Sequence, residues 1–146
     1  MNIASSVFSR RSEQHGERDR MKVIVIDLDG TLTVDAPGEP YETRQPRRDV
    51  IEKLRSVKEK GYRVVVQTAR NMNSFSGNIG LINVRTLPGV LEWLARHNVP
   101  FDEVIVGKPW CGAEGFYVDD KAVRPDEFVA HDLSELQRIV GNSSQT

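Results

Sequence analysis

Six side chains that could bind or transform a charged ligand stand at or just after the ends of short apolar stretches. Two carboxylates one residue apart repel each other and lose solvation on burial, so an acid pair after an apolar run points to chemistry or to a bound cation. A second acid pair stands further along the chain, and a threonine and a lysine follow two other apolar runs. In chain order, the six residues are Asp27, Asp29, Thr68, Lys108, Asp119 and Asp120.

These residue types suit a phosphoryl group held beside a hard metal ion. All candidate metal ligands in the set are oxygens, with no histidine or thiolate among them, and this favours Mg²⁺ over Zn²⁺. The ion and Lys108 would neutralise phosphoryl oxygens, and the Thr68 hydroxyl would hydrogen-bond one of them. One aspartate could then attack phosphorus and form an aspartyl phosphate. A second, two residues further on, could protonate the leaving oxygen and later activate water.

The apolar runs before these residues predict strands, and amphipathic stretches between them predict helices. The continuous Val and Ile run at 22–26 is typical of a strand covered on both faces, as in a parallel sheet. Residues 34–46 contain several prolines and no periodicity, so we expect a loop or small flap there, and the polar stretch 71–85 is also expected to be irregular. Further strands are predicted at 63–67, 104–106 and 116–118, and helices at 49–61, 86–98 and 132–141.

This order of elements predicts an α/β layered fold with a mainly parallel sheet. Ligands of such folds bind at the carboxyl ends of the strands, and each predicted strand would bring a polar or charged group to that edge. Four carboxylates gathered there would repel each other by several kcal/mol without a neutralising partner. The predicted topology therefore also implies a bound cation.

The stretches DLDGTLT, VVVQTAR, GKPW and GFYVDDKA resemble, in this order, the motifs of the haloacid dehalogenase (HAD) superfamily of phosphohydrolases. The resemblance covers residues 21–140 and implies a three-layer, Rossmann-like sandwich. It implies that Asp27 is the nucleophile and Asp29 the general acid and base, with Thr68 and Lys108 binding the phosphoryl group. Mg²⁺ would be held by the Asp27 carboxylate, the Asp29 backbone carbonyl and Asp119. Asp120 would either bind the metal directly or support the metal site without contacting the ion.

The intervals between these motifs leave no room for a separate cap domain. Residues 32–63 are expected to contain only the flap and one helix. Residues 69–107 are expected to contain a loop, one helix and one strand. The resemblance therefore implies a capless enzyme with an open site. Such sites either accept bulky substrates or are closed by a neighbouring subunit, so a homo-oligomer stays open as an alternative.

Several nearby residues have two interpretations. Lys121 competes with Lys108 for the phosphate, but Lys108 precedes a proline on the loop after a predicted strand and is preferred. Arg70 could contact substrate or form a surface salt bridge. Trp110 and Phe75 could form a platform for a substrate ring or simply pack.

Composition restricts the class of protein. The chain has 146 residues with 20 basic and 21 acidic side chains, and this balance does not favour nucleic acid as a partner. The single cysteine, Cys111, suits a reducing cytoplasm. No apolar run reaches the roughly 18 residues needed to cross a membrane. We expect a disordered arm at 1–20 and one hydrolase domain at 21–146.

We therefore expect a cytoplasmic, Mg²⁺-dependent phosphomonoester hydrolase that acts on a small phosphorylated substrate. The phrases TARN, GKPW and GFYVDDKAVRP look like bacterial phosphatases of capsule or polysaccharide biosynthesis, which suggests a sugar or polyol phosphate. One alternative is a phosphatase for nucleotides or nucleic-acid ends. Another is a catalytically idle binding module on the same fold.

Overall fold

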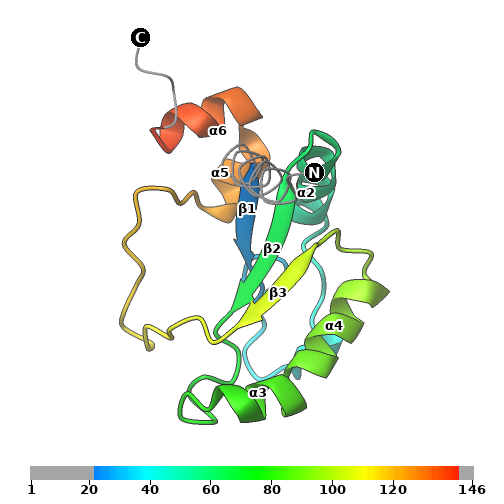
Figure 1. Cartoon of the computed structure of the whole chain (residues 1–146), viewed down its shortest axis with the longest axis vertical. Coiled ribbons are helices and arrows are strands. Elements are labelled where there is room, and N and C mark those ends of the chain that lie inside the picture. Colours follow the sequence, from blue (N-terminus) through cyan, green and yellow to red (C-terminus); the bar gives the residue numbers. More distant parts are fainter. Residues whose placement is uncertain (1–21, 142–146) are drawn as a thin grey trace, which may run out of the picture.

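The computed structural model describes residues 22–141, in which helices pack around one face of a small sheet (Figure 1). The strands are β1 (Val23–Asp27), β2 (Arg63–Thr68) and β3 (Glu103–Val106). The helices are α2 (Arg48–Glu59), α3 (Ile79–Arg85), α4 (Leu87–Arg96), α5 (Pro125–Ala130) and α6 (Leu133–Ile139), with a 3-10 helix at Tyr41–Thr43. The arm expected at 1–20 lies outside the described residues.

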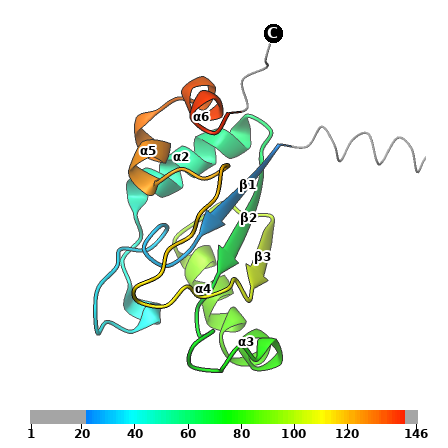
Figure 2. The same cartoon turned by 90° about the vertical axis from the view of Figure 1, so that its left-hand side faces the viewer.

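The sheet is parallel, with its strands in the order β1-β2-β3. Val25 lies opposite Val65, and Val66 lies opposite Val104. The predicted α/β fold with a parallel sheet is thereby confirmed. All three arrowheads point to the same edge of the sheet in both views (Figures 1 and 2), so the residues that follow the strands share that edge.

One face of the sheet packs against the helices. Ile26, Val64 and Val66 point to this face and join buried side chains of α2, α4, α5 and α6 in a single core. Each fully buried aliphatic side chain in such a core stabilises the fold by roughly 1.5–3 kcal/mol. The core therefore fixes the strands, and with them the polar residues at their carboxyl ends.

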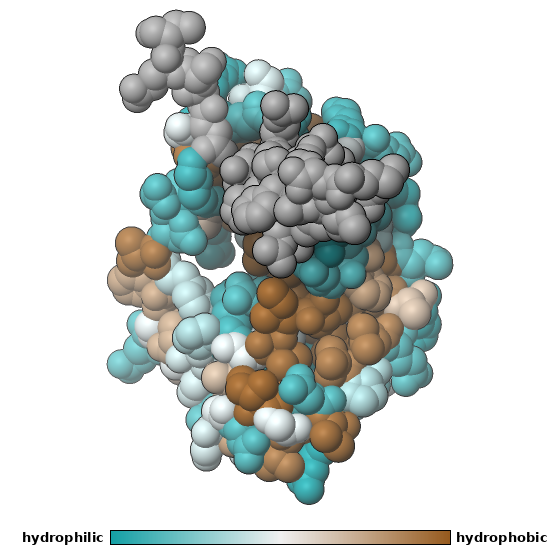
Figure 3. Space-filling model, in the orientation of Figure 1, coloured by the Kyte–Doolittle hydropathy of each residue, from teal (hydrophilic) through white to brown (hydrophobic). Residues whose placement is uncertain are grey.

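The opposite face of the sheet is more open than the sequence predicts. Val25 is 60% exposed and Ile105 is 48% exposed, and hydrophobic atoms gather over the middle of the molecule in Figure 3. Residues 22–26 were expected to form a strand covered on both faces. Within residues 22–141, that expectation is wrong for β1.

Two segments differ from the predicted secondary structure. Residues 71–85, expected to be irregular, contain α3, which begins where the Asn78 side chain accepts a hydrogen bond from the Leu81 N–H at 3.1 Å. Residues 116–118, expected to be a strand, lie in an exposed coil. Phe116 is 79% exposed and Val118 is 89% exposed, so neither gains the burial that a strand in the sheet would give it.

The predicted helices are present with shifted ends. The helix expected at 49–61 is α2, and Gly61 follows its last turn with a φ of 93°, a backbone angle that favours glycine. The helix expected at 132–141 is α6, where the Asp132 side chain accepts a hydrogen bond from the Glu135 N–H at 2.9 Å. Among the described residues, no helix is long and apolar enough to cross a membrane.

Candidate active site

Three of the predicted site residues meet at the carboxyl edge of the sheet. Asp27 ends β1, Thr68 ends β2, and Lys108 follows β3 after a one-residue turn. The Lys108 backbone N–H donates to the Thr68 carbonyl at 3.1 Å, and its Nζ lies 3.4 Å from Oδ1 of Asp27. These residues line a pocket of about 420 Å³, together with Asp29 and Arg70. The convergence predicted for the first three strands is therefore present.

A tight turn after β1 positions the two aspartates. The Leu28 carbonyl accepts backbone hydrogen bonds from Thr31, Leu32 and Thr33 at 2.9–3.2 Å. Gly30 adopts a φ of 79°, a backbone angle that residues with a Cβ rarely adopt. This angle lets the chain reverse its direction directly after Asp29. Both carboxylates therefore stay at the sheet edge while the chain leaves it.

The Asp27 carboxylate is partly shielded from solvent, with 32% of its side chain exposed. Burial raises the pKa of Asp27 above its usual range, although the Lys108 ammonium lowers it in part. The Thr31 hydroxyl donates to Oδ2 at 3.3 Å. One oxygen thus faces a cation and the other a hydroxyl, and these two contacts fix the orientation of the carboxylate in the pocket.

The Asp29 carboxylate is held by two arginines. Arg70 donates from Nε to Oδ2 at 3.1 Å and from Nη2 to Oδ1 at 2.7 Å. Arg44 approaches Oδ1 more loosely, at 3.4 Å. Both guanidinium groups also lie over the ring of Tyr41. The Cζ atom of Arg70 is 4.1 Å from the ring centroid, and that of Arg44 is 4.5 Å from it.

Thr68 is almost fully buried and is one of the residues that line the pocket. Its Oγ1 accepts a hydrogen bond from the Arg70 backbone N–H at 3.1 Å. Because that bond uses the oxygen as an acceptor, the hydroxyl proton stays available for a ligand oxygen.

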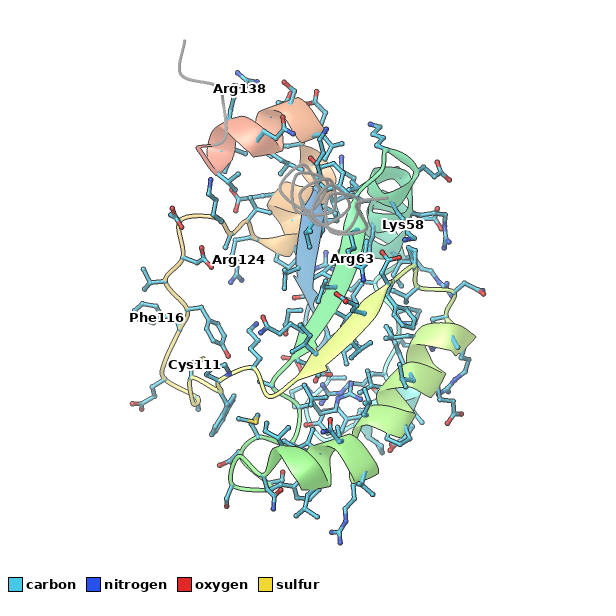
Figure 4. The ribbon with its side chains drawn as sticks, in the orientation of Figure 1. Lys58, Arg63, Cys111, Phe116, Arg124 and Arg138 are labelled. Carbon is cyan, nitrogen blue, oxygen red and sulfur yellow. The ribbon has the colours of Figure 1, made fainter. Side chains whose placement is uncertain are left out.

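Asp119 and Asp120 are not brought to this pocket. Neither residue is part of the pocket lining, and Figure 4 shows Phe116, on the coil between β3 and α5, away from the strands. Asp119 Oδ1 accepts the backbone N–H of Lys121 at 2.7 Å, which is a local turn contact. The expectation that every predicted strand brings a polar or charged group to one edge fails for the last strand, because residues 116–118 form no strand.

The acidic groups as placed do not complete the expected Mg²⁺ site. Within residues 22–141, no three His, Cys, Asp or Glu side chains lie close enough together to hold a metal ion. Of the carboxylates in the described part of the chain, only those of Asp27 and Asp29 line the pocket, and Asp29 already forms ion pairs with arginines.

Several lining residues were not identified as site residues from the sequence. Tyr41 and Arg44 come from the 34–46 flap, where no periodicity marks any side chain, and Tyr117 comes from the coil after β3. Trp110, one of the two aromatics considered as a platform, lines the pocket, whereas Phe75 is not part of its lining. Of the two candidate lysines, Lys108 lines the pocket and Lys121 does not.

The chain is similar to several solved structures. No protein-family model matches the chain. No curated protein matches it either. Two solved structures, one of a Pnkp1/Rnl/Hen1 complex and one of the Pnkp1/Rnl/Hen1 RNA repair complex, share 20% and 18% identity with TM-scores of 0.46 and 0.45. They cover 76% and 86% of this chain and 35% and 33% of their own chains.

A crystal structure of an MCSG target from Vibrio cholerae is far more similar. It is 51% identical, with a TM-score of 0.80, over 84% of this chain and 98% of the Vibrio cholerae chain. Identity at this level over nearly the whole of the other chain shows common descent and a shared fold. The chain therefore belongs to the same family as this Vibrio cholerae protein.

Proposed function

We propose that the chain is a phosphomonoester hydrolase of the haloacid dehalogenase type, which passes the phosphoryl group to Asp27 and then to water. The observation that carries this proposal is the grouping of Asp27, Thr68 and Lys108 in one pocket at the carboxyl edge of a parallel sheet. A carboxylate nucleophile beside an ammonium group and a buried hydroxyl donor suits attack on a phosphate dianion.

In the first step, a carboxylate oxygen of Asp27 attacks phosphorus, and the bond to the leaving oxygen breaks. Asp29, in its protonated form, donates the proton that the leaving oxygen needs, from an orientation set by Arg70 and Arg44. In the second step, Asp29 takes a proton from water, which attacks phosphorus and releases Asp27 and phosphate. Lys108 offsets charge on the phosphoryl oxygens in both steps.

Magnesium remains part of the proposal. The Asp27 carboxylate, the Asp29 backbone carbonyl and Asp119 would hold the ion, with Asp120 as a further ligand or a support. Asp119 and Asp120 lie outside the pocket as placed, so such a site would require the coil after β3 to approach β1. Bound there, the ion would neutralise phosphoryl oxygens.

As substrate we propose a sugar or polyol phosphate used to make surface-polysaccharide precursors in the cytoplasm. Asn71, Asn73 and Ser74 line the pocket and offer hydrogen bonds to hydroxyl groups. A nucleotide is the second candidate, because Tyr41, Trp110 and Tyr117 line the same pocket and could stack on a base. A neighbouring copy of the chain that closes the open site remains part of the proposal.

The test is phosphate release from a panel of phosphorylated sugars, polyols and nucleotides, with Mg²⁺ and with EDTA, for wild type and Asp27→Asn. We expect metal-dependent release that the variant loses, and the best substrate then decides between sugar and nucleotide. Asp126→Asn is the matched control, since this exposed acid lies on α5 outside the pocket. Absence of release from every substrate would favour an idle binding module instead.

A further inference from the structure

Arg44 reaches the pocket from a segment whose backbone is fixed. The indole Nε1 of Trp93, a fully buried residue of α4, donates to the Arg44 carbonyl at 2.9 Å. One residue later, the Gln45 carbonyl accepts the Val34 N–H at 2.7 Å. The Arg44 guanidinium therefore starts from a preset position at the pocket wall, which lowers the entropy lost when it binds a ligand.

The pocket carries one more cation than its acids can neutralise. Asp27 is next to Lys108, and Asp29 is held by Arg70 through two short hydrogen bonds. These pairs leave the charge of Arg44 uncompensated within the pocket lining. The lining therefore has a net charge of about +1 with each group in its usual state at pH 7.

The contacts of Arg44 are weak for a side chain that is only 13% exposed. Its Nη1 lies 3.4 Å from Asp29 Oδ1 and 3.8 Å from Asp35 Oδ1, and the Asp35 side chain is largely in solvent. Its Nε is buried without a hydrogen-bond partner among the described residues. A shielded guanidinium normally uses its donors more fully. Because Nε is closed off by burial, the capacity for a further anion lies at the Nη groups, which have one long hydrogen bond to Asp29.

We propose that Arg44 binds a second anionic group of the substrate, a carboxylate or a further phosphate, next to the phosphoryl group that is transferred. This inference rests on the proposed hydrolase function and narrows its substrate class to phosphomonoesters that bear another negative charge. The planar guanidinium suits a carboxylate or phosphate because it can donate two parallel hydrogen bonds to either. Lys108, with its Nζ 3.4 Å from Asp27 Oδ1, remains with the transferred phosphoryl group.

The kinetic test compares pairs of substrates that differ in the second anion. The carboxylate arm uses 3-phosphoglycerate and glycerol 3-phosphate, and the phosphate arm uses fructose 1,6-bisphosphate and fructose 6-phosphate. We expect the wild type to favour the doubly anionic member of at least one pair by roughly tenfold to a hundredfold in kcat/KM. In Arg44→Gln the ratio within that pair should fall towards one, and Arg44→Lys should retain part of it.

Arg48→Gln is the matched control, because this exposed arginine begins α2 outside the pocket lining and its loss removes the same charge. It should keep the wild-type ratio. Hydrolysis that shows no preference for the second anion, or a preference that Arg44→Gln leaves intact, would overturn the inference while the hydrolase function stands.

A binding measurement separates this inference from the hydrolase proposal. Pyrophosphate and inorganic phosphate are titrated in EDTA against the wild type and Arg44→Gln, with the shift in thermal unfolding temperature as the readout. Pyrophosphate should raise the wild-type temperature more than phosphate does, and Arg44→Gln should remove the difference. The expected difference between the two anions does not depend on whether any substrate is hydrolysed. Equal shifts for the two anions in the wild type would count against Arg44 as an anion-binding residue.

Discussion

The Lys108 Nζ lies 3.4 Å from Oδ1 of Asp27, although 81 residues separate them in the chain. The ammonium lowers the pKa of Asp27, and burial raises it by more, so the net shift is upward. Lys108 thus keeps a buried carboxylate more acidic than its surroundings alone would allow. In the proposed reaction the same ammonium group would contact the phosphoryl group, so Lys108 would act on both Asp27 and the group that Asp27 attacks.

Lys108→Met should raise the pKa of Asp27 further, because the carboxylate loses its nearest cation. The measurement is an NMR titration of the Asp27 carboxyl group in EDTA, which removes any metal from the comparison. Phosphatase kcat/KM should fall by about 10²–10³-fold, the usual cost of removing one donor from a developing charge. Lys60→Met, an exposed residue at the end of α2, is the control and should leave both quantities unchanged. An unchanged Asp27 titration in Lys108→Met would contradict the pairing.

Asp27→Asn should abolish turnover, by roughly 10⁴-fold or more, and at the same time stabilise the fold. The raised pKa means that the ionised carboxylate opposes folding, so stability is lost as the pH rises through the folded-state pKa of Asp27. Asparagine cannot ionise and removes this effect. The thermal unfolding temperature at pH 7 should therefore be higher in the variant, and the difference should shrink in acid.

Asp102→Asn should change the thermal unfolding temperature in the opposite direction to Asp27→Asn. Hydrogen bonds from Lys58 Nζ and from the Val64 N–H, both at 2.8 Å, lower the pKa of Asp102. Its stabilising contribution is present above the unfolded-state pKa and is lost as the pH falls through the folded-state value. The variant should unfold at a lower temperature than the wild type at pH 7. A lower unfolding temperature for both variants would mean that the Asp27 carboxylate stabilises the fold and does not oppose it.

The parallel sheet explains which part of the site could be predicted. The apolar runs before Asp27, Thr68 and Lys108 form strands that run in the same direction, so their ends had to share one edge. The run before Asp119 is too short to carry that inference, since three apolar residues after Gly115 have no neighbour to pair with in the described structure. Periodicity alone does not show whether a short apolar run is paired or exposed.

The arginines around Asp29 were harder to foresee. Arg70 follows β2 and lies 41 residues from Asp29, and its side chain is 4% exposed, so it forms a buried ion pair where a surface one was considered. Arg44 lies in the flap, 15 residues from Asp29, with no pattern around it. Their positions depend on the turn at Gly30 and on Trp93, which are tertiary features.

Asp29→Asn should reveal whether Asp29 handles the proton of the leaving group. Turnover of an alkyl phosphate needs that proton and should fall by about 10²–10⁴-fold. Turnover of p-nitrophenyl phosphate should fall much less, because its leaving group departs readily as an anion. The measurement is kcat for both substrates in the same preparation. Equal losses would show that Asp29 holds Arg70 and Arg44 in place without transferring a proton.

Asp119→Asn tests whether the coil after β3 joins the metal site during turnover. If Asp119 becomes a Mg²⁺ ligand, the Mg²⁺ concentration for half-maximal activity should rise about tenfold or more in the variant, because the ion loses a charged ligand. Asp126→Asn removes an exposed acid from the neighbouring α5 and should leave that concentration unchanged. Asp120→Asn separates the two acids, with a smaller rise expected if Asp120 only supports the ligand. If Asp119→Asn and Asp126→Asn behave alike, the coil stays outside the site as the structure places it, and Asp27 would have to hold any ion without Asp119.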